Sequence, residues 1–224
     1  MTDVIQKEWS SKDLTYVASG TERKVFEPNF GGDFLIKIRH PFVVTKESTL
    51  RERLYGQFPR LRNRYIEREK FHSDYVNSRA KEMSLPCPIA RILDIVSVDG
   101  EKGIAVEKIT DSRGDLAPDL LTFSKKLNDD EVLVQLLNKF VKDLIALKVI
   151  AYDLFPNNIL VINDIQTGLP RLILIDGFGD RKVIKIRTWF DYFRNRYLTK
   201  GLVQLARCLN LTWNTKDQRF EIPH

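Results

Sequence analysis

The strongest structural signal in this sequence is an amphipathic helix predicted over residues 131–148. Apolar side chains recur there at i, i+3 and i+4 spacing, at Val132, Leu133, Leu136, Leu137, Phe140, Val141, Leu144 and Ile145. This spacing places them on one face of an α-helix. A helix with such a stripe is stabilised mainly by packing. We therefore expect it to lie at the centre of a helical region.

The residues before this helix show the alternation that is typical of short strands. The pattern predicts strands over 14–18, 23–27 and 33–39, a helix over about 61–81, and a hairpin formed by 89–98 and 103–109. After the amphipathic helix we expect two short strands, 159–162 and 172–175, and a helical tail over 187–210. The chain is therefore expected to be an α+β protein. Residues 1–109 would form a β-rich part, and residues 110–224 a mainly helical part with a small β-hairpin.

Composition limits the class of protein further. The 224 residues are 43% hydrophobic and 29% charged, as in globular proteins that fold without staples. No apolar run reaches the ~18 residues of a membrane span, and residues 1–12 lack the apolar stretch of a signal peptide. Cys87 and Cys208 are too far apart to suggest a metal site, and we interpret them as reduced core thiols. These features predict a cytoplasmic protein.

The net charge of +6 is concentrated in two zones, residues 51–81 and 181–219. Such zones are either solvated helix faces or contacts for an anionic partner, such as nucleotide phosphate, an acidic substrate or nucleic acid. In the second zone aromatic residues alternate with arginines, at Trp189, Phe190, Tyr192, Phe193 and Tyr197. We favour packing of these rings against the protein over stacking on bases.

Three side chains suited to phosphate chemistry stand where predicted elements meet. Asp153 and Asn158 belong to the run D-L-F-P-N-N-I-L at 153–160, and Asp176 ends the next strand. One carboxylate can orient an attacking hydroxyl and accept its proton. An amide oxygen and a second carboxylate are hard ligands for a Mg²⁺ ion that bridges the phosphates of ATP. The structural alternative is a cluster of turn-forming Asp and Asn residues.

With these residues in this order, the chain resembles the protein-kinase-like superfamily. The resemblance implies a minimal two-lobed protein-kinase-like fold. It also implies that Asp153 is the general base or hydroxyl-orienting group, and that Asn158 and Asp176 hold Mg²⁺. The run Asp176-Gly177-Phe178-Gly179 looks like the metal-binding D-F-G element with one glycine inserted.

The same resemblance assigns nucleotide binding to the first part of the chain. Gly20 and Thr21 fall at the turn that covers the phosphates, and Lys37 matches the lysine that holds the α- and β-phosphates. Glu107 and Ile109 lie in the hinge that would receive adenine. Two alternatives remain for these positions: Gly20 can simply close a hairpin, and Lys37 can be a strand lysine that faces solvent.

A helix glutamate that orients Lys37 is the remaining element of the resemblance. Glu69 is the best candidate, and Glu67 is the alternative, because helical periodicity does not separate the two. An ordinary charged helix residue is the structural alternative for Glu69.

The chain is more narrowly similar to the YrbL family of bacterial PhoP regulatory network proteins, over about residues 19–205. The similarity rests on residues 20–26, 35–38, 68–69, 156–160, 176–179 and 188–189. It implies a compact kinase-like fold and a link to a two-component regulon. It does not imply a substrate.

Departures from the superfamily pattern shape the expected function. Ala151 and Tyr152 replace the usual His and Arg, Phe155 replaces a frequent Lys, and about 45 residues follow Gly179. We expect an ATP- and Mg²⁺-dependent phosphotransferase. Its acceptor is unknown, but a small molecule is favoured over a peptide, and an anionic acceptor is one of the alternatives. One alternative is an inactive pseudokinase that binds a nucleotide or a partner. A basic nucleic-acid-binding module ranks last, because it leaves the acidic residues unexplained.

Overall fold

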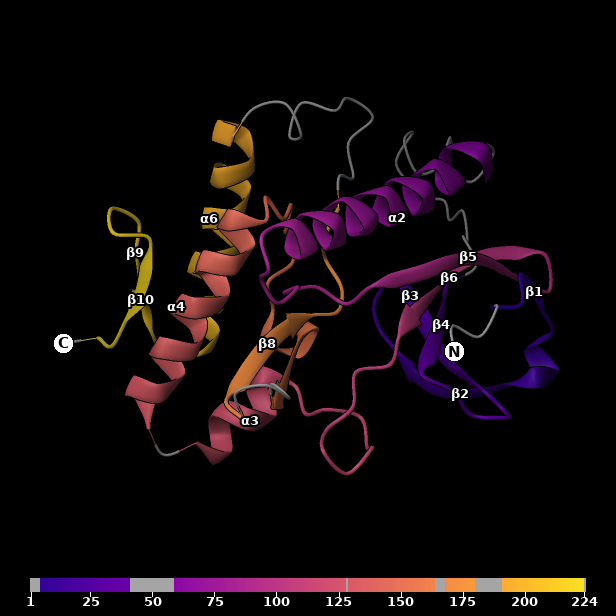
Figure 1. Cartoon of the computed structure of the whole chain (residues 1–224), viewed down its shortest axis with the longest axis horizontal. Coiled ribbons are helices and arrows are strands. Elements are labelled where there is room, and N and C mark those ends of the chain that lie inside the picture. The colour runs from indigo at the N-terminus through magenta and orange to yellow at the C-terminus, as the bar shows by residue number, and fades with distance from the viewer. Residues whose placement is uncertain (1–4, 41–58, 128, 164–167, 180–190, 224) are drawn as a thin grey trace, which may run out of the picture. The chain divides into compact units, whose positions relative to one another are not determined.

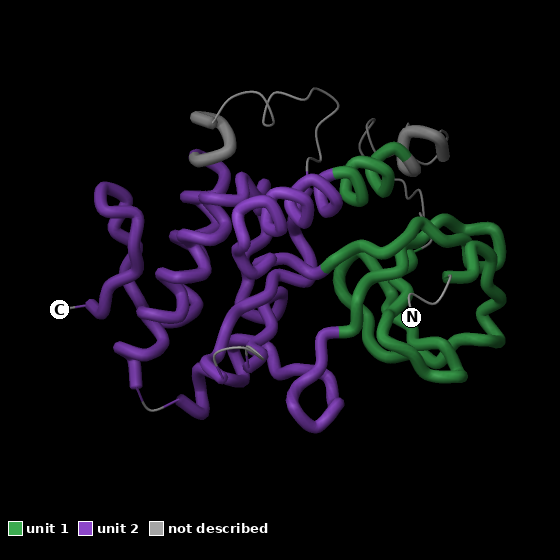
Figure 2. The backbone as a smooth tube through the Cα atoms, in the orientation of Figure 1, with its two compact units in different colours: residues 1–71, 91–108 green, residues 72–90, 109–224 purple. Residues whose placement is uncertain are grey.

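Two compact units make up the computed structural model of this chain (Figure 2). It describes residues 5–40, 59–127, 129–163, 168–179 and 191–223, and their side chains except in 59–63 and 191–195. The first unit comprises residues 1–71 and 91–108, and the second comprises 72–90 and 109–224. The long helix α2 (Pro59–Glu82) contributes residues to both units. Each unit is therefore described by itself.

A curled six-stranded sheet forms the body of the first unit (Figure 1). Its strands are β1 (Glu8–Trp9), β2 (Leu14–Ser19), β3 (Arg23–Pro28), β4 (Phe34–Arg39), β5 (Ile92–Val98) and β6 (Glu101–Glu107). Their order across the sheet is β1-β5-β6-β4-β3-β2. All neighbours are antiparallel except β1 and β5, which are parallel. The predicted strands are confirmed, whereas the two-residue strand β1 was not predicted.

The apolar core of this sheet includes residues from five of its six strands. Its buried members are Trp9, Leu14, Phe34, Ile36, Val96, Val98 and Ala105. The edge of the Trp9 ring packs against Phe34, with 5.9 Å between the ring centroids. Because this core lies under β4, it fixes the strand that carries Lys37.

The hairpin between β5 and β6 has a tighter turn than the sequence suggested. The prediction began the second strand at Gly103, but β6 begins at Glu101. Asp99 and Gly100 have φ angles of 48° and 84°. Two successive residues with positive φ allow a two-residue hairpin turn, so the strand can start two residues earlier.

The second unit combines helices with two small hairpins. Its elements after α2 are α3 (Leu120–Lys126), α4 (Asp130–Ala146), the 3-10 turn η2 (Pro156–Asn158), β7 (Ile159–Asn163), β8 (Pro170–Leu174), α6 (Asp191–Cys208), β9 (Thr212–Asn214) and β10 (Arg219–Glu221). Helix α4 packs against β8 and β10, and α6 contacts β9. The predicted helices and the β7–β8 hairpin are confirmed, although the start of the predicted tail helix, 187–190, lies outside the described residues. Helix α3 and the β9–β10 hairpin were not predicted. The fold class is mixed α+β.

Helix α4 is the amphipathic helix that the sequence predicts. The Asp129 side chain accepts hydrogen bonds from the N–H groups of Glu131 and Val132, which caps its first turn. The helix ends at Ala146, two residues before the predicted end, and Lys148 has a φ of 57°. This left-handed conformation is incompatible with continuing the helix.

Two other expectations concern the membrane and the cysteines. Among the residues that the structure describes, no helix is long and apolar enough to cross a membrane. Cys87 and Cys208 form no disulfide and are only half-buried. The interpretation of both as core thiols is therefore wrong.

Candidate functional site

The loop that carries Asp153 is joined to the segment after β8 by main-chain hydrogen bonds. The Tyr152 N–H donates to the Gly177 carbonyl over 2.9 Å, and the Gly179 N–H donates to the Ile150 carbonyl over 2.8 Å. Such bonds depend only on the backbone path, so they fix the two segments in one register. The structure thus brings Asp153 next to the residues that follow Asp176.

A third main-chain bond closes the other end of the loop. The Ile175 N–H donates to the Asn158 carbonyl over 2.8 Å. Because Ile175 directly precedes Asp176, this bond places Asn158 beside the second carboxylate as well. The three residues predicted from the sequence, Asp153, Asn158 and Asp176, therefore lie on adjoining stretches of backbone.

Gly177 is the point of closest approach between these stretches. It has a φ of 78°, and a Cβ atom added to it would lie 2.4 Å from the Cβ atom and 2.8 Å from the carbonyl oxygen of Asp153. No side chain fits there, and the backbone conformation also favours glycine. The glycine is therefore required by the contact with Asp153.

The side chains at this junction are hydrogen bonded to one another. The Asn158 Nδ2 group donates to the Asp153 carbonyl over 3.2 Å and to Asp153 Oδ2 over 3.1 Å. These two bonds use the amide nitrogen of Asn158 and leave its side-chain oxygen as a separate acceptor. Asp176 Oδ1 accepts the Gly177 N–H over 2.8 Å. All three side chains are half-buried, so a ligand can reach them.

These groups suit Mg²⁺ but do not form a cage for it. In the described part of the chain, no three His, Cys, Asp or Glu residues are arranged to hold a metal ion. Mg²⁺ needs only one or two protein oxygens when phosphates and water complete its octahedron. The amide oxygen of Asn158 and the carboxylate of Asp176 fit this requirement.

Two residues outside the motif support the loop within the second unit. His72 on α2 is buried, and its Nε2 atom accepts the Ile150 N–H over 3.0 Å. The second residue is Gly201 of α6, which packs against the buried Leu154 of the loop. A Cβ atom added to Gly201 would lie 3.1 Å from the Cδ1 atom of Leu154. The sequence analysis missed both contacts, because each joins residues that are far apart in the chain.

In the first unit, Lys37 and Glu69 are both buried, with exposed fractions of 7% and 2%. Arg23 holds Glu69 with two hydrogen bonds, one of 3.1 Å from Nη1 to Oε1 and a second from Nη2 to Oε2. The alternative, Glu67, is exposed and lies 3.5 Å from Lys102. Glu69 is thus the glutamate that faces the protein interior. That it orients Lys37 stays a prediction.

The turn from residue 19 to residue 23 is held by contacts of the His40 ring and by main-chain hydrogen bonds. The His40 Nε2 atom lies 3.0 Å from the Gly20 carbonyl oxygen and 3.2 Å from Ser19 Oγ. A main-chain bond of 2.9 Å from the Gly20 N–H to the Arg23 carbonyl closes the turn. Thr21 is exposed at its tip. A Cβ atom at Gly20 would meet only the Arg23 carbonyl oxygen, at 3.8 Å, so the turn itself does not require glycine.

The predicted hinge residues already have partners within their own units. The Glu107 carboxylate accepts hydrogen bonds of 2.8 Å from both N–H and Nε of Arg91. The Lys108 N–H donates to the Asp33 carbonyl over 2.9 Å. Ile109 belongs to an apolar cluster of the second unit, together with Ala90, Ala117 and Ile173. Adenine binding by these residues stays a prediction.

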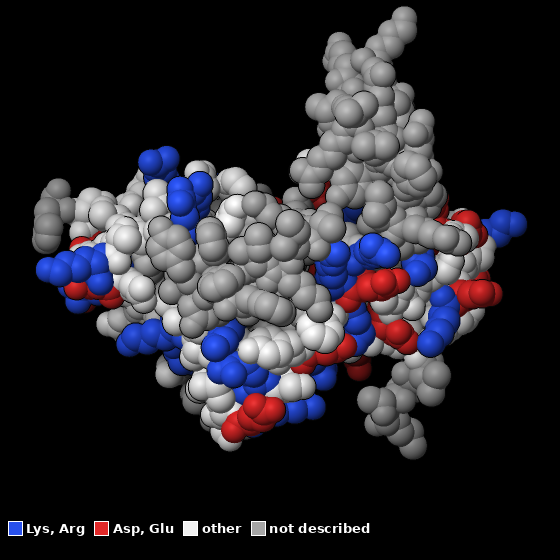
Figure 3. Space-filling view, turned by 90° about the horizontal axis from the view of Figure 1, so that it is seen from above, with Lys and Arg blue, Asp and Glu red and all other residues white. Residues whose placement is uncertain are grey.

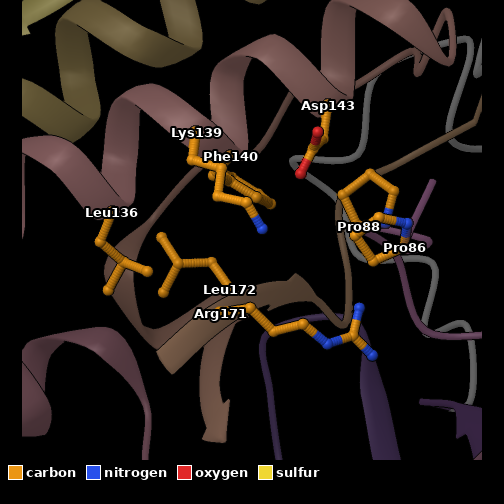
Figure 4. Close-up of a pocket in the computed structure, with 8 residues that line it drawn as sticks. All are labelled: Pro86, Pro88, Leu136, Lys139, Phe140, Asp143, Arg171 and Leu172. Carbon is orange, nitrogen blue, oxygen red and sulfur yellow. The ribbon is translucent and has the colours of Figure 1, made fainter. Parts of the chain in front are cut away.

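A pocket elsewhere in the second unit contains none of the predicted site residues (Figure 4). It is lined by Pro86, Pro88, Leu136, Lys139, Phe140, Asp143, Arg171 and Leu172. Burial raises the pKa of Asp143, and the charges of Lys139 and Arg171 act in the opposite direction. We assign no part of the candidate site to this pocket.

Charged side chains of both signs are interspersed on the face shown in Figure 3. Much of the two basic zones, including residues 51–58 and 181–190, lies outside the described residues. Trp189 and Phe190 also lie outside the described residues, and the side chains of Tyr192 and Phe193 are not described. Tyr197 is half-buried. The predicted role of the aromatic tail therefore stays a prediction.

Comparison with known proteins gives one clear result. No curated protein matches the chain. The family described as PhoP regulatory network protein YrbL matches residues 11–210. This match covers most of the sequence, including Gly20, Lys37, Asp153 and Asp176. The chain therefore belongs to the YrbL family of PhoP regulatory network proteins.

Proposed function

We propose that the chain is an ATP- and Mg²⁺-dependent phosphotransferase with a minimal two-lobed protein-kinase-like fold. One observation carries the proposal: Gly177 packs directly on Asp153, and backbone hydrogen bonds place Asn158 and Asp176 beside it. If the Asp and Asn residues only formed turns, a glycine at position 177 in direct contact with Asp153 of another segment would not be required. The family's description also leads us to propose that the protein acts in the PhoP regulatory network.

Each side chain at the junction has a distinct role in this proposal. Asp153 orients the acceptor hydroxyl and accepts its proton, and the hydrogen bond from Asn158 holds the carboxylate in place for this step. The Asn158 oxygen and the Asp176 carboxylate hold Mg²⁺, which neutralises phosphate charge when it is bound. In the first unit, Lys37 binds the α- and β-phosphates. Gly20, Thr21, Glu107 and Ile109 form the rest of the nucleotide site.

Calorimetric titration with ATP, with and without Mg²⁺, tests the nucleotide site. We compare the wild type with Asp176→Asn, which keeps the shape of the side chain but removes its charge. Asp115→Asn in the same unit is the control, because Asp115 is an exposed loop carboxylate outside the site. We expect Mg²⁺-dependent ATP binding that Asp176→Asn abolishes and Asp115→Asn retains. Equal binding by all three proteins would contradict the metal assignment.

A pseudokinase is the second candidate, and Phe155 favours it. Its ring is 45% exposed in the candidate catalytic loop, where the superfamily often has a lysine that contacts the γ-phosphate. Transfer of labelled γ-phosphate to panels of sugars, lipid head groups and peptides separates the two functions. Transfer that Asp153→Asn abolishes supports the phosphotransferase. Nucleotide binding without any transfer supports the pseudokinase.

A nucleic-acid-binding module is the third candidate and rests on the net charge of +6. It predicts binding to DNA or RNA that weakens steeply as salt is added. It ranks last because it leaves Asp153, Asn158 and Asp176 unexplained. Absence of binding at low salt would remove this candidate.

A further inference from the structure

Three cations lie on one face of two neighbouring strands in the first unit. Arg23 of β3 is directly opposite Arg39 of β4 in the antiparallel register. Lys37 lies two residues before Arg39 on β4, and side chains two residues apart in a strand point to the same face. Like charges directly opposite each other destabilise a sheet. This face therefore carries an electrostatic cost.

A buried carboxylate and an aromatic ring offset part of this cost. Glu69 neutralises Arg23, and it is the single acidic residue among the buried charged residues of the described chain. The guanidinium carbons of Arg23 and Arg39 lie 5.9 and 4.3 Å from the centre of the same Tyr65 ring. The ring provides cation–π stabilisation but no negative charge. The cations on this face thus outnumber its buried carboxylates.

Arg39 has weaker contacts to the protein than Arg23. Its ion pair with Glu22 is long, at 3.8 Å, and its buried Nε atom has no hydrogen-bond partner. Burial, and then the charge of Arg23, lower the pKa of Arg39 below its ordinary value. Its side chain is 24% exposed, whereas that of Arg23 is only 6% exposed. A ligand from solution can therefore reach Arg39 more easily than Arg23.

We propose that Arg39 is an anion-binding residue that holds phosphate oxygens of the nucleotide's polyphosphate chain. A guanidinium group donates hydrogen bonds in a planar fork that matches phosphate oxygens, and the added negative charge would reduce the repulsion between Arg39 and Arg23. The turn that carries Glu22 is adjacent, since the His40 N–H donates to the Glu22 carbonyl over 3.0 Å. Glu22 competes with the phosphate for Arg39. The assignment of the anion to a nucleotide rests on the proposed function.

The test compares Arg39→Gln with Lys24→Gln. Both remove one positive charge, but Lys24 is exposed and points to the opposite face of β3. Calorimetry measures binding of inorganic tripolyphosphate and of ATP with Mg²⁺. Loss of a charge-assisted hydrogen bond should weaken binding of both ligands by about tenfold or more in Arg39→Gln, whereas Lys24→Gln should change it less than about twofold. Glu22→Gln removes the competing carboxylate and should strengthen binding.

The outcomes separate this inference from the proposed function. If the wild type binds tripolyphosphate through Arg39 but does not bind ATP, the anion site stands and the proposed function fails. If the wild type binds ATP and Arg39→Gln behaves like Lys24→Gln, the anion site is refuted and the proposed function stands. No binding of either anion to the wild type also refutes it. Melting curves of each variant show that it is folded, and Arg39→Lys, which keeps the charge without the fork, should bind with intermediate affinity.

Discussion

The two segments that we assign to phosphate chemistry are held in place by different kinds of contact. In the second unit, main-chain hydrogen bonds and the packing of Gly177 on Asp153 join the Asp153–Asn158 loop to the segment that follows β8. In the first unit, main-chain hydrogen bonds also close the turn at residues 19–23, but side-chain contacts from the His40 ring to Gly20 and Ser19 add to them. A close approach of two backbone segments requires a particular residue, as at Gly177. A contact between side chains that are distant in the sequence produces no local sequence pattern.

Substituting Gly177 should have the largest effect, because it breaks the backbone junction. In Gly177→Ala the new Cβ atom would overlap Asp153, and the residue would also be strained at its positive φ. Together the two effects should cost about 2–6 kcal/mol of unfolding free energy. This corresponds to a fall in Tm of roughly 5–20 °C, which calorimetry or circular dichroism can measure.

Gly114→Ala is the matched control for this prediction. Gly114 has a φ of 87°, but no atom lies within 4 Å of an added Cβ. Its substitution should show the backbone strain alone, about 1–2 kcal/mol. Equal losses in the two variants would mean that the contact between Gly177 and Asp153 does not hold the loop.

Breaking the buried pair Arg23–Glu69 tests how much side-chain contacts stabilise the first unit. Glu69→Gln leaves the Arg23 guanidinium buried without its counter-charge, on a face that also carries Arg39. We expect a loss of about 3 kcal/mol of unfolding free energy, measured by urea denaturation. Glu67→Gln is the control, because Glu67 forms an exposed pair with Lys102 and should cost less than about 1 kcal/mol.

A double-mutant cycle sharpens this result. Arg23→Met and Glu69→Met should each destabilise strongly, whereas the double variant should recover much of the loss, because it removes both buried charges. Strictly additive losses would show that the two side chains do not stabilise each other. In that case the His40 contacts would be the remaining evidence that side chains hold this part of the first unit in place.

The contacts of the His40 side chain with the turn at residues 19–23 should contribute less to stability than the buried Arg23–Glu69 pair. His40→Ala removes the contact with the Gly20 carbonyl oxygen and should cost about 1 kcal/mol. Amide hydrogen exchange should quicken in residues 19–23 and stay unchanged in the β7–β8 hairpin, which lies in the other unit. Unchanged exchange in the turn would mean that another contact holds it.

The same contrast explains what could be predicted from the sequence. The strands of the sheet and helix α4 follow from periodicity, whereas the set Asp153, Asn158 and Asp176 was predicted from the order of these residues and from the resemblance to the protein-kinase-like superfamily. Of the residues at this junction, Gly177 is the one that the backbone conformation requires. The partner of Glu69 could not be predicted, because Arg23 is 46 residues away and no local pattern connects the two. His72 was missed for the same reason, since its acceptor role depends on a residue 78 positions later.

Gly20→Ala should have the smallest effect on stability and the most informative effect on binding. An added Cβ meets only ordinary contact at 3.8 Å, and Gly20 has no positive φ, so stability should change by less than about 1 kcal/mol. If the turn backbone approaches bound phosphates, the methyl group should weaken binding of ATP with Mg²⁺ in calorimetry. If affinity is unchanged as well, Gly20 only closes a hairpin, and the phosphate contacts of the first unit must come from cationic side chains such as Lys37 and Arg39.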